Sequence, residues 1–121
     1  MMLRAATISL CITLVAGSAA ASGWTIKDLG GIPTEAGCAD LAWDVFTRYR
    51  GVESASDVQR SGWIVYGYGL SSGDYDGVIT CGYGPDDSTR ATLAVHSAGG
   101  ADADTRRAIA ERLERYWAQT K

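Results

Sequence analysis

Residues 63–97, WIVYGYGLSSGDYDGVITCGYGPDDSTRATLAVHS, decide the fold. The runs 63–70 and 77–83 are rich in β-branched and aromatic residues, and 89–97 alternates apolar and polar residues as a half-buried strand does. The links 71–77 and 84–88 are rich in Ser, Gly, Asp and Pro, the residues of tight turns. The stretch therefore predicts three antiparallel strands joined as a meander.

A helix is predicted before the meander, after the capping residue Thr34. Its apolar residues recur at the helical spacing and form one stripe: Cys38, Leu41, Ala42, Val45, Phe46 and Tyr49. Gly51 stands where a helix-ending residue in the left-handed conformation is expected.

A second helix is predicted after the meander, from Thr105 to about Gln119, capped by Asp102 or Asp104. Its apolar face consists of Ile109, Leu113, Tyr116 and Trp117. Residues 22–31 form a short extended segment, and the polar residues 51–60 are expected to be a connection. The order β-α-β-β-β-α predicts an α+β fold, in which two helices pack on one face of the meander and the N-terminal segment can add a short strand.

Two cysteines, Cys38 and Cys81, follow the first 21 residues, and they allow one pairing in an oxidising compartment. Their spacing is not the close Cys-x-x-Cys of redox motifs, so we expect a structural disulfide. Cys38 lies on the helical stripe and Cys81 in the middle strand. The bridge would join helix to sheet, with Ile79, Cys81 and Tyr83 on the core face.

Residues 1–21 have the three parts of a secretory signal peptide: a start that carries Arg4, an apolar run over 5–16, and small residues at Ala19 and Ala21. The apolar run is shorter than the roughly 20 residues that span a bilayer. We therefore expect cleavage, a single small domain over 22–121, no membrane span after cleavage, and a periplasmic or secreted location. The Arg-rich, Ala-rich and Gly-rich composition favours a bacterial source.

The formal net charge is −3. This mild acidity argues against nucleic acid as a partner, because phosphate binding needs clustered positive charge. Residues 72–79 resemble only the first part of a calcium-binding loop, since Tyr83 stands in place of the closing Glu. We therefore expect no metal site and no cofactor.

The candidate binding residues are the aromatic residues of the first two strands of the meander. Glycines interrupt these strands, and a glycine within a strand indicates a bulge or the close approach of another group. Tyr and Trp offer rigid contact area with a polar tip. Two interpretations stay open, a cover over a thin sheet and a binding face; the residues concerned are Trp63, Tyr66, Tyr68, Tyr75 and Tyr83.

These observations predict a small exported, non-catalytic domain that binds a macromolecule, as an interaction or inhibitor-like module with an envelope or extracellular protein as its partner. The alternative is a small-ligand or glycan binder that stacks aromatic side chains on its ligand. A third hypothesis is a small hydrolase-type enzyme that uses the single histidine, His96, with an aspartate. The sequence has no nucleophile elbow, so we do not expect an enzyme. It carries no signal for an oligomeric state.

Overall fold

The structure, a computed structural model, describes residues 23–71, 73–99 and 101–121. The predicted signal peptide, residues 1–21, lies outside the described residues. The strands form one antiparallel sheet in the order β1-β5-β4-β3-β2, so β4 is central. The described elements, in chain order, are β1 (Gly23–Ile32), α1 (Glu35–Val52), β2 (Asp57–Ser61), β3 (Ile64–Leu70), β4 (Tyr75–Tyr83), β5 (Thr89–Ser97) and α2 (Ala103–Thr120).

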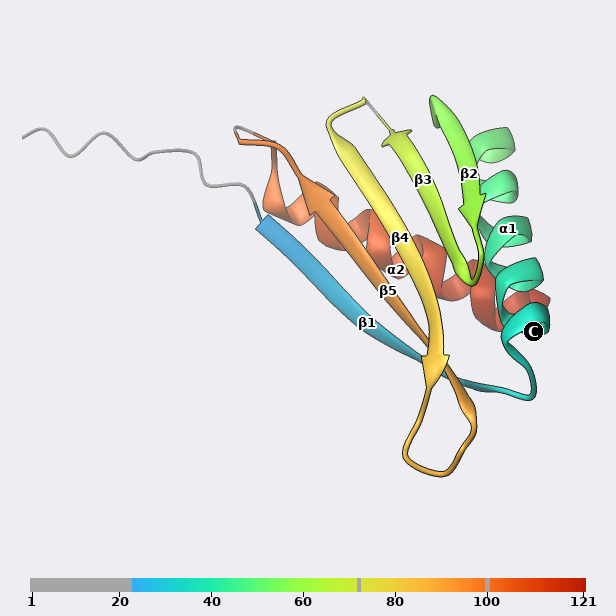
Figure 1. Cartoon of the computed structure of the whole chain (residues 1–121). Coiled ribbons are helices and arrows are strands. Elements are labelled where there is room, and N and C mark those ends of the chain that lie inside the picture. The colour runs from blue at the N-terminus through green and yellow to red at the C-terminus, as the bar shows by residue number, and fades with distance from the viewer. Residues whose placement is uncertain (1–22, 72, 100) are drawn as a thin grey trace, which may run out of the picture.

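Both helices lie on the same face of the sheet, behind it in the view of Figure 1. α1 packs mainly on β2, β3 and β4, whereas α2 packs on β1 and β5. The predicted α+β arrangement, with two helices on one sheet face, is therefore confirmed. Neither helix of the described chain combines the length and the apolar character that a membrane crossing requires.

The predicted cap Thr34 of α1 is confirmed, as is Asp102, one of the two candidate caps of α2. α2 begins at Ala103, two residues before the predicted Thr105, and the predicted end of α1 is wrong. The hydroxyl of Thr34 accepts a hydrogen bond from the Gly37 N–H at 3.0 Å, and the carboxylate of Asp102 accepts one from the Asp104 N–H at 3.0 Å. α1 continues through Gly51 to Val52, and the N–H of Glu53 donates to the Tyr49 carbonyl at 2.8 Å. Glycine permits a left-handed turn but does not impose one.

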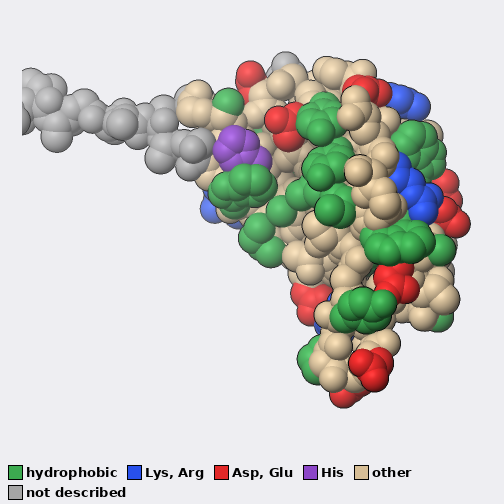
Figure 2. Space-filling model, in the orientation of Figure 1, with side chains coloured by type: hydrophobic (Ala, Val, Ile, Leu, Met, Phe, Trp, Pro, Cys, Tyr) green, Lys and Arg blue, Asp and Glu red, His purple; other side chains and the backbone are tan. Residues whose placement is uncertain are grey.

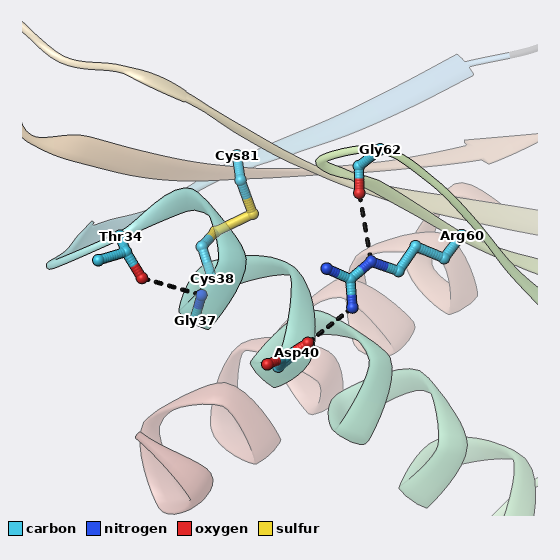
Figure 3. Close-up of a disulfide and its surroundings, with 7 residues drawn as sticks. All are labelled: Thr34, Gly37, Cys38, Asp40, Arg60, Gly62 and Cys81. Carbon is cyan, nitrogen blue, oxygen red and sulfur yellow. Dashed lines mark hydrogen bonds and ion pairs between the residues drawn. A yellow bond between two sulfur atoms is a disulfide. The ribbon is translucent and has the colours of Figure 1, made fainter.

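The predicted disulfide joins Cys38, in the first turns of α1, to Cys81 on β4, with the two Cα atoms 5.9 Å apart (Figure 3). An ion pair close to it holds the hairpin of β2 and β3 to the same helix. The Arg60 guanidinium of β2 donates to the Asp40 carboxylate of α1 at 2.6 Å and to the Gly62 carbonyl at 3.2 Å. The first turns of α1 are thus fixed to the sheet by a covalent bond and a polar contact.

The glycines inside β3 and β4 make room for a helix side chain. Gly67 and Gly77 are register partners, and both face the fully buried ring of Phe46 on α1. A Cβ atom at Gly67 would overlap this ring, and one at Gly77 would lie 3.0 Å from its Cε1 atom. The close approach that strand glycines indicate is therefore made here by α1.

One strand, β2, was not expected from the sequence, whereas the N-terminal strand was. The predicted connection 51–60 contains most of β2, a five-residue edge strand in which only Val58 is buried. One buried residue gives too little apolar alternation to indicate a strand. The extended segment expected over 22–31 is confirmed as the strand β1, which pairs with β5 and has a bulge between Asp28 and Gly30.

Tyr83 was predicted on the core face with Ile79 and Cys81; it lies on that face, near Glu35 of α1, but it is not part of the buried core. Ile79 and Cys81 are buried, but the Tyr83 side chain is 82% exposed. Tyr83 is the last residue of β4 and lies two positions beyond the disulfide. The alternation along the strand is kept, but at this end of β4 the tyrosine contributes nothing to the buried core.

Candidate functional site

The sheet face opposite the helices, here called the open face, has no helix over it in the described part of the chain. Its side chains form rows across the strands, because directly paired residues point to the same side of a sheet. Trp24 of β1 pairs with His96 of β5, and His96 pairs with Asp76 of β4. The row beside it crosses all five strands: Ile26, Ala94, Val78, Tyr66 and Gln59.

Large apolar side chains are exposed on this face. Trp24 is 61% exposed, Ile26 59% and Tyr68 37%. Figure 2 looks onto the open face and shows hydrophobic side chains across it, with the chain's single histidine among them. The open face therefore carries an apolar surface at one end of the sheet.

The aromatic rings on the open face are ordered by contacts with one another. Tyr66 and Tyr68 stack with 5.8 Å between ring centroids and 9° between ring planes. The indole of Trp24 lies against the His96 imidazole, with centroids 4.6 Å apart and planes tilted by 44°. Packing of this kind limits the side-chain freedom that a partner would otherwise have to restrict on binding.

A bulge in β3 reverses the faces of this strand after Tyr68. Gly69 has a φ of +59°, and the register of β3 with β4 shifts between Gly67 and Leu70. Leu70 is consequently turned into the core, whereas Tyr68 stays exposed. The carboxylate of Asp76 accepts a hydrogen bond from the Gly69 N–H at 2.9 Å and so holds the bulge from the neighbouring strand.

A hollow of about 170 Å³ lies at this end of the open face. Residues of four strands line it: Trp24 of β1, Tyr66 and Tyr68 of β3, Asp76, Gly77 and Val78 of β4, and His96 of β5. It is the place where the two aromatic pairs and the Asp76 carboxylate come together, and we take it as the candidate functional site.

Of the predicted site residues, the structure brings Tyr66 and Tyr68 together on the open face. Tyr75 is buried in the core, and its hydroxyl donates to the Asp102 carbonyl at 3.3 Å. Trp63 lies between β2 and β3 and is exposed there, away from the hollow. Tyr83 is at the far end of β4, where a hydrogen bond to Glu35 raises the pKa of its hydroxyl.

Sequence reasoning missed Trp24 and His96 as parts of one site. Trp24 lies near the start of β1 and His96 near the end of β5, 72 positions later in the sequence (96 minus 24). Only the pairing of β1 with β5 brings the two side chains together. The signal that could have found Trp24 was the alternation of Trp24 and Ile26 with polar neighbours, which is typical of a strand with one apolar face.

A second hollow, of about 160 Å³, lies on the helix side between α1 and α2 and includes Tyr49, Glu53 and Arg112. Its charges satisfy each other, because the Arg112 guanidinium lies 2.9 Å from the Glu53 carboxylate. Burial raises the pKa of Tyr49 to about 12 and keeps its hydroxyl neutral. This hollow therefore offers no uncompensated charge to a ligand.

Within 23–71, 73–99 and 101–121, no group of three or more His, Cys, Asp or Glu side chains is placed to hold a metal ion. In the same residues, no hydrogen bond connects the His96 ring to a carboxylate; the ring lies against Trp24 instead.

Comparisons with protein family models, with curated proteins and with solved structures find no match to this chain.

Proposed function

We propose that this protein is an exported, non-catalytic binding module that recognises a protein partner through the open face of its sheet. Residues 1–21 support export by their signal-peptide pattern. The Cys38–Cys81 disulfide fits a periplasmic or extracellular protein, because such bonds persist in oxidising compartments.

The observation that carries the proposal is the exposure of Trp24, Ile26 and Tyr68 on one face of the sheet. Small soluble proteins rarely leave large apolar side chains together on a surface unless something binds there. Trp and Tyr are also the residues that most often supply the binding energy of protein interfaces. These side chains come from β1 and β3, which are held in place by the strands between them.

The test is affinity capture from the protein's own envelope extract with the oxidised protein as bait. Three baits are compared: the unchanged protein, a Tyr66→Ser/Tyr68→Ser variant, and a Trp43→Gln control. Trp43 is exposed on α1, beside Asp40, Asp44 and Arg60, and does not line the hollow of the open face. Circular dichroism establishes that all three baits are folded.

The proposal predicts one protein that the unchanged bait and the control retain and the double variant loses. The same pair, remade from purified components, should bind in calorimetry with the same dependence on Tyr66 and Tyr68. A partner that binds all three baits equally, or no retained partner at all, would contradict the proposal.

The hollow beside Trp24 favours a second candidate, a glycan or small-ligand binder. Its aromatic lining suits stacking on a sugar or a planar ring. Titration of a carbohydrate panel, followed by tryptophan fluorescence, separates this candidate from the first. Saturable quenching that a Trp24→Thr variant abolishes would support it, and an unchanged spectrum across the panel would exclude those ligands.

A further inference from the structure

The hollow on the open face combines aromatic ring surfaces with a carboxylate. Trp24, Tyr66 and Tyr68 supply the rings and Asp76 supplies the carboxylate, while the His96 imidazole lies against the Trp24 indole. Ring faces carry negative electrostatic potential and attract cations within about 6 Å of the ring centre, Trp most strongly. The Trp and Tyr rings and the Asp76 carboxylate therefore favour a positively charged group over a neutral or negative one.

The Asp76 carboxylate is held in place without being neutralised. Its Oδ1 atom accepts the Gly69 N–H at 2.9 Å, which orients the group but leaves its charge uncompensated. No ion pair within 4.0 Å involves Asp76 among the described residues. A second carboxylate, that of Asp57, lies on the next strand beyond, where Asp57 is the register partner of Tyr68.

The basic side chains of the sheet are placed elsewhere. Lys27 and Arg60 point to the helix side, where they approach Glu114 at 3.8 Å and Asp40 at 2.6 Å. Arg90 is on the open face but several residues along β5 from His96, and it is paired with Asp28 at 2.7 Å. No Lys or Arg is among the described residues that line the hollow.

We infer that the hollow receives a cationic side chain of the protein partner, and specifically an arginine. The guanidinium is planar, so it stacks on an indole or phenol face while its N–H groups reach a carboxylate in a fork. Lysine has the charge but neither the plane nor the fork. This inference rests on the proposed function and names the chemistry that the open face recognises.

The test uses acetyl-arginine amide as the probe, titrated into the isotope-labelled, oxidised protein and followed by NMR chemical shifts. A single exposed side chain should bind with a dissociation constant in the millimolar range. The shifts should concentrate on the Trp24 indole N–H and on the amides of Tyr66, Tyr68 and Asp76. Acetyl-citrulline amide, which has nearly the same shape without the charge, should bind about tenfold more weakly.

Two variants test whether the negative charge of Asp76, rather than the bulge that its side chain holds, is what binds the arginine probe. Asp76→Asn keeps an oxygen that can accept the Gly69 N–H, so the bulge should persist while binding of the arginine probe weakens about two- to fivefold. Asp86→Asn makes the same change of charge in the turn between β4 and β5, at the other end of the hairpin, and should leave binding unchanged.

Equal binding of the arginine and citrulline probes, equal binding to the Asp76→Asn variant, or shifts confined to other surfaces would overturn the inference. The proposed function has a separate outcome. If the arginine probe fails while the Tyr66→Ser/Tyr68→Ser bait still loses its partner, the open face binds a protein by other chemistry. If capture also fails, both are wrong.

Discussion

The two faces of the sheet are built from the same strands but differ in what covers them. On the helix side, Val65, Ile79, Leu93 and Val95 are fully buried under α1 and α2. On the open side, the alternate positions of the same strands carry Tyr66, Tyr68 and His96, and β1 adds Trp24 and Ile26. The covered face accounts for stability, because burial of apolar area drives folding. The open face contributes little to stability, so its large side chains call for another explanation.

The largest effect is expected from Phe46→Ala on the covered face. The substitution should lower the free energy of unfolding by about 5 kcal/mol, the upper end of the usual range for such truncations. The loss is large because Gly67 and Gly77, opposite the ring, have no side chains that could move into the space. Urea unfolding measures it, and a loss below about 2 kcal/mol would show that the ring is not the centre of the core.

Removal of the disulfide comes next. A Cys38→Ala/Cys81→Ala variant should lose about 4 kcal/mol, since the bridge spans a sequence separation of 43 residues and restricts the unfolded chain. Comparing the urea midpoint of this variant with that of the oxidised protein tests the prediction. If the variant and the oxidised protein had the same urea midpoint, the disulfide would not lower the conformational entropy of the unfolded chain enough to affect stability.

A smaller effect is expected at the start of α1. Thr34→Ala removes the hydroxyl that accepts the Gly37 N–H, and it should cost about 1 kcal/mol. Thr34→Ser is the matched control, because it retains the acceptor and should stay close to the unchanged protein. The prediction fails if the Ala and Ser variants unfold at the same urea concentration.

The smallest effect on stability is expected on the open face. Trp24→Thr keeps a strand-forming residue and removes an exposed indole, so the free energy of unfolding should change by less than about 0.5 kcal/mol. Thermal and urea unfolding would both detect a larger loss. If Trp24→Thr lowered the free energy of unfolding as much as Phe46→Ala, Trp24 would be a structural residue, and the two faces would not differ in their contribution to stability.

The covered face was largely predictable from the sequence. The stripe through Cys38, Val45 and Phe46 identified the buried side of α1, and the cysteine on that stripe indicated the bond to Cys81. Helical periodicity is a local signal, which a single sequence carries in full. The disulfide could be predicted although its cysteines are 43 residues apart, because only two cysteines follow the first 21 residues and allow one pairing.

The open face was predictable only in part. Tyr66 and Tyr68 stand on one strand and could be recognised, but Trp24 joins them through the pairing of β1 with β5, which no local pattern encodes. The bulge at Gly69 also changes which residues point outward, since a shift of one residue reverses the two faces of a strand. Pairing partners and bulges are tertiary features. The strand β2 was missed because only one of its residues is buried, so its sequence shows no apolar alternation, and its pairing with β3 is what makes it a strand.

Hydroxyl-radical footprinting of the protein, free and bound to the partner that it captures, tests the central claim most directly. Trp24, Trp43 and Trp63 are all exposed in the free protein, at 61%, 36% and 48%, so each reports on its own part of the surface. If the open face is the binding surface, Trp24 and Tyr68 should be oxidised several times more slowly in the complex, while Trp43 and Trp63 react as before. Protection of Trp43 or Trp63 with Trp24 unchanged would place the interface elsewhere and contradict the account.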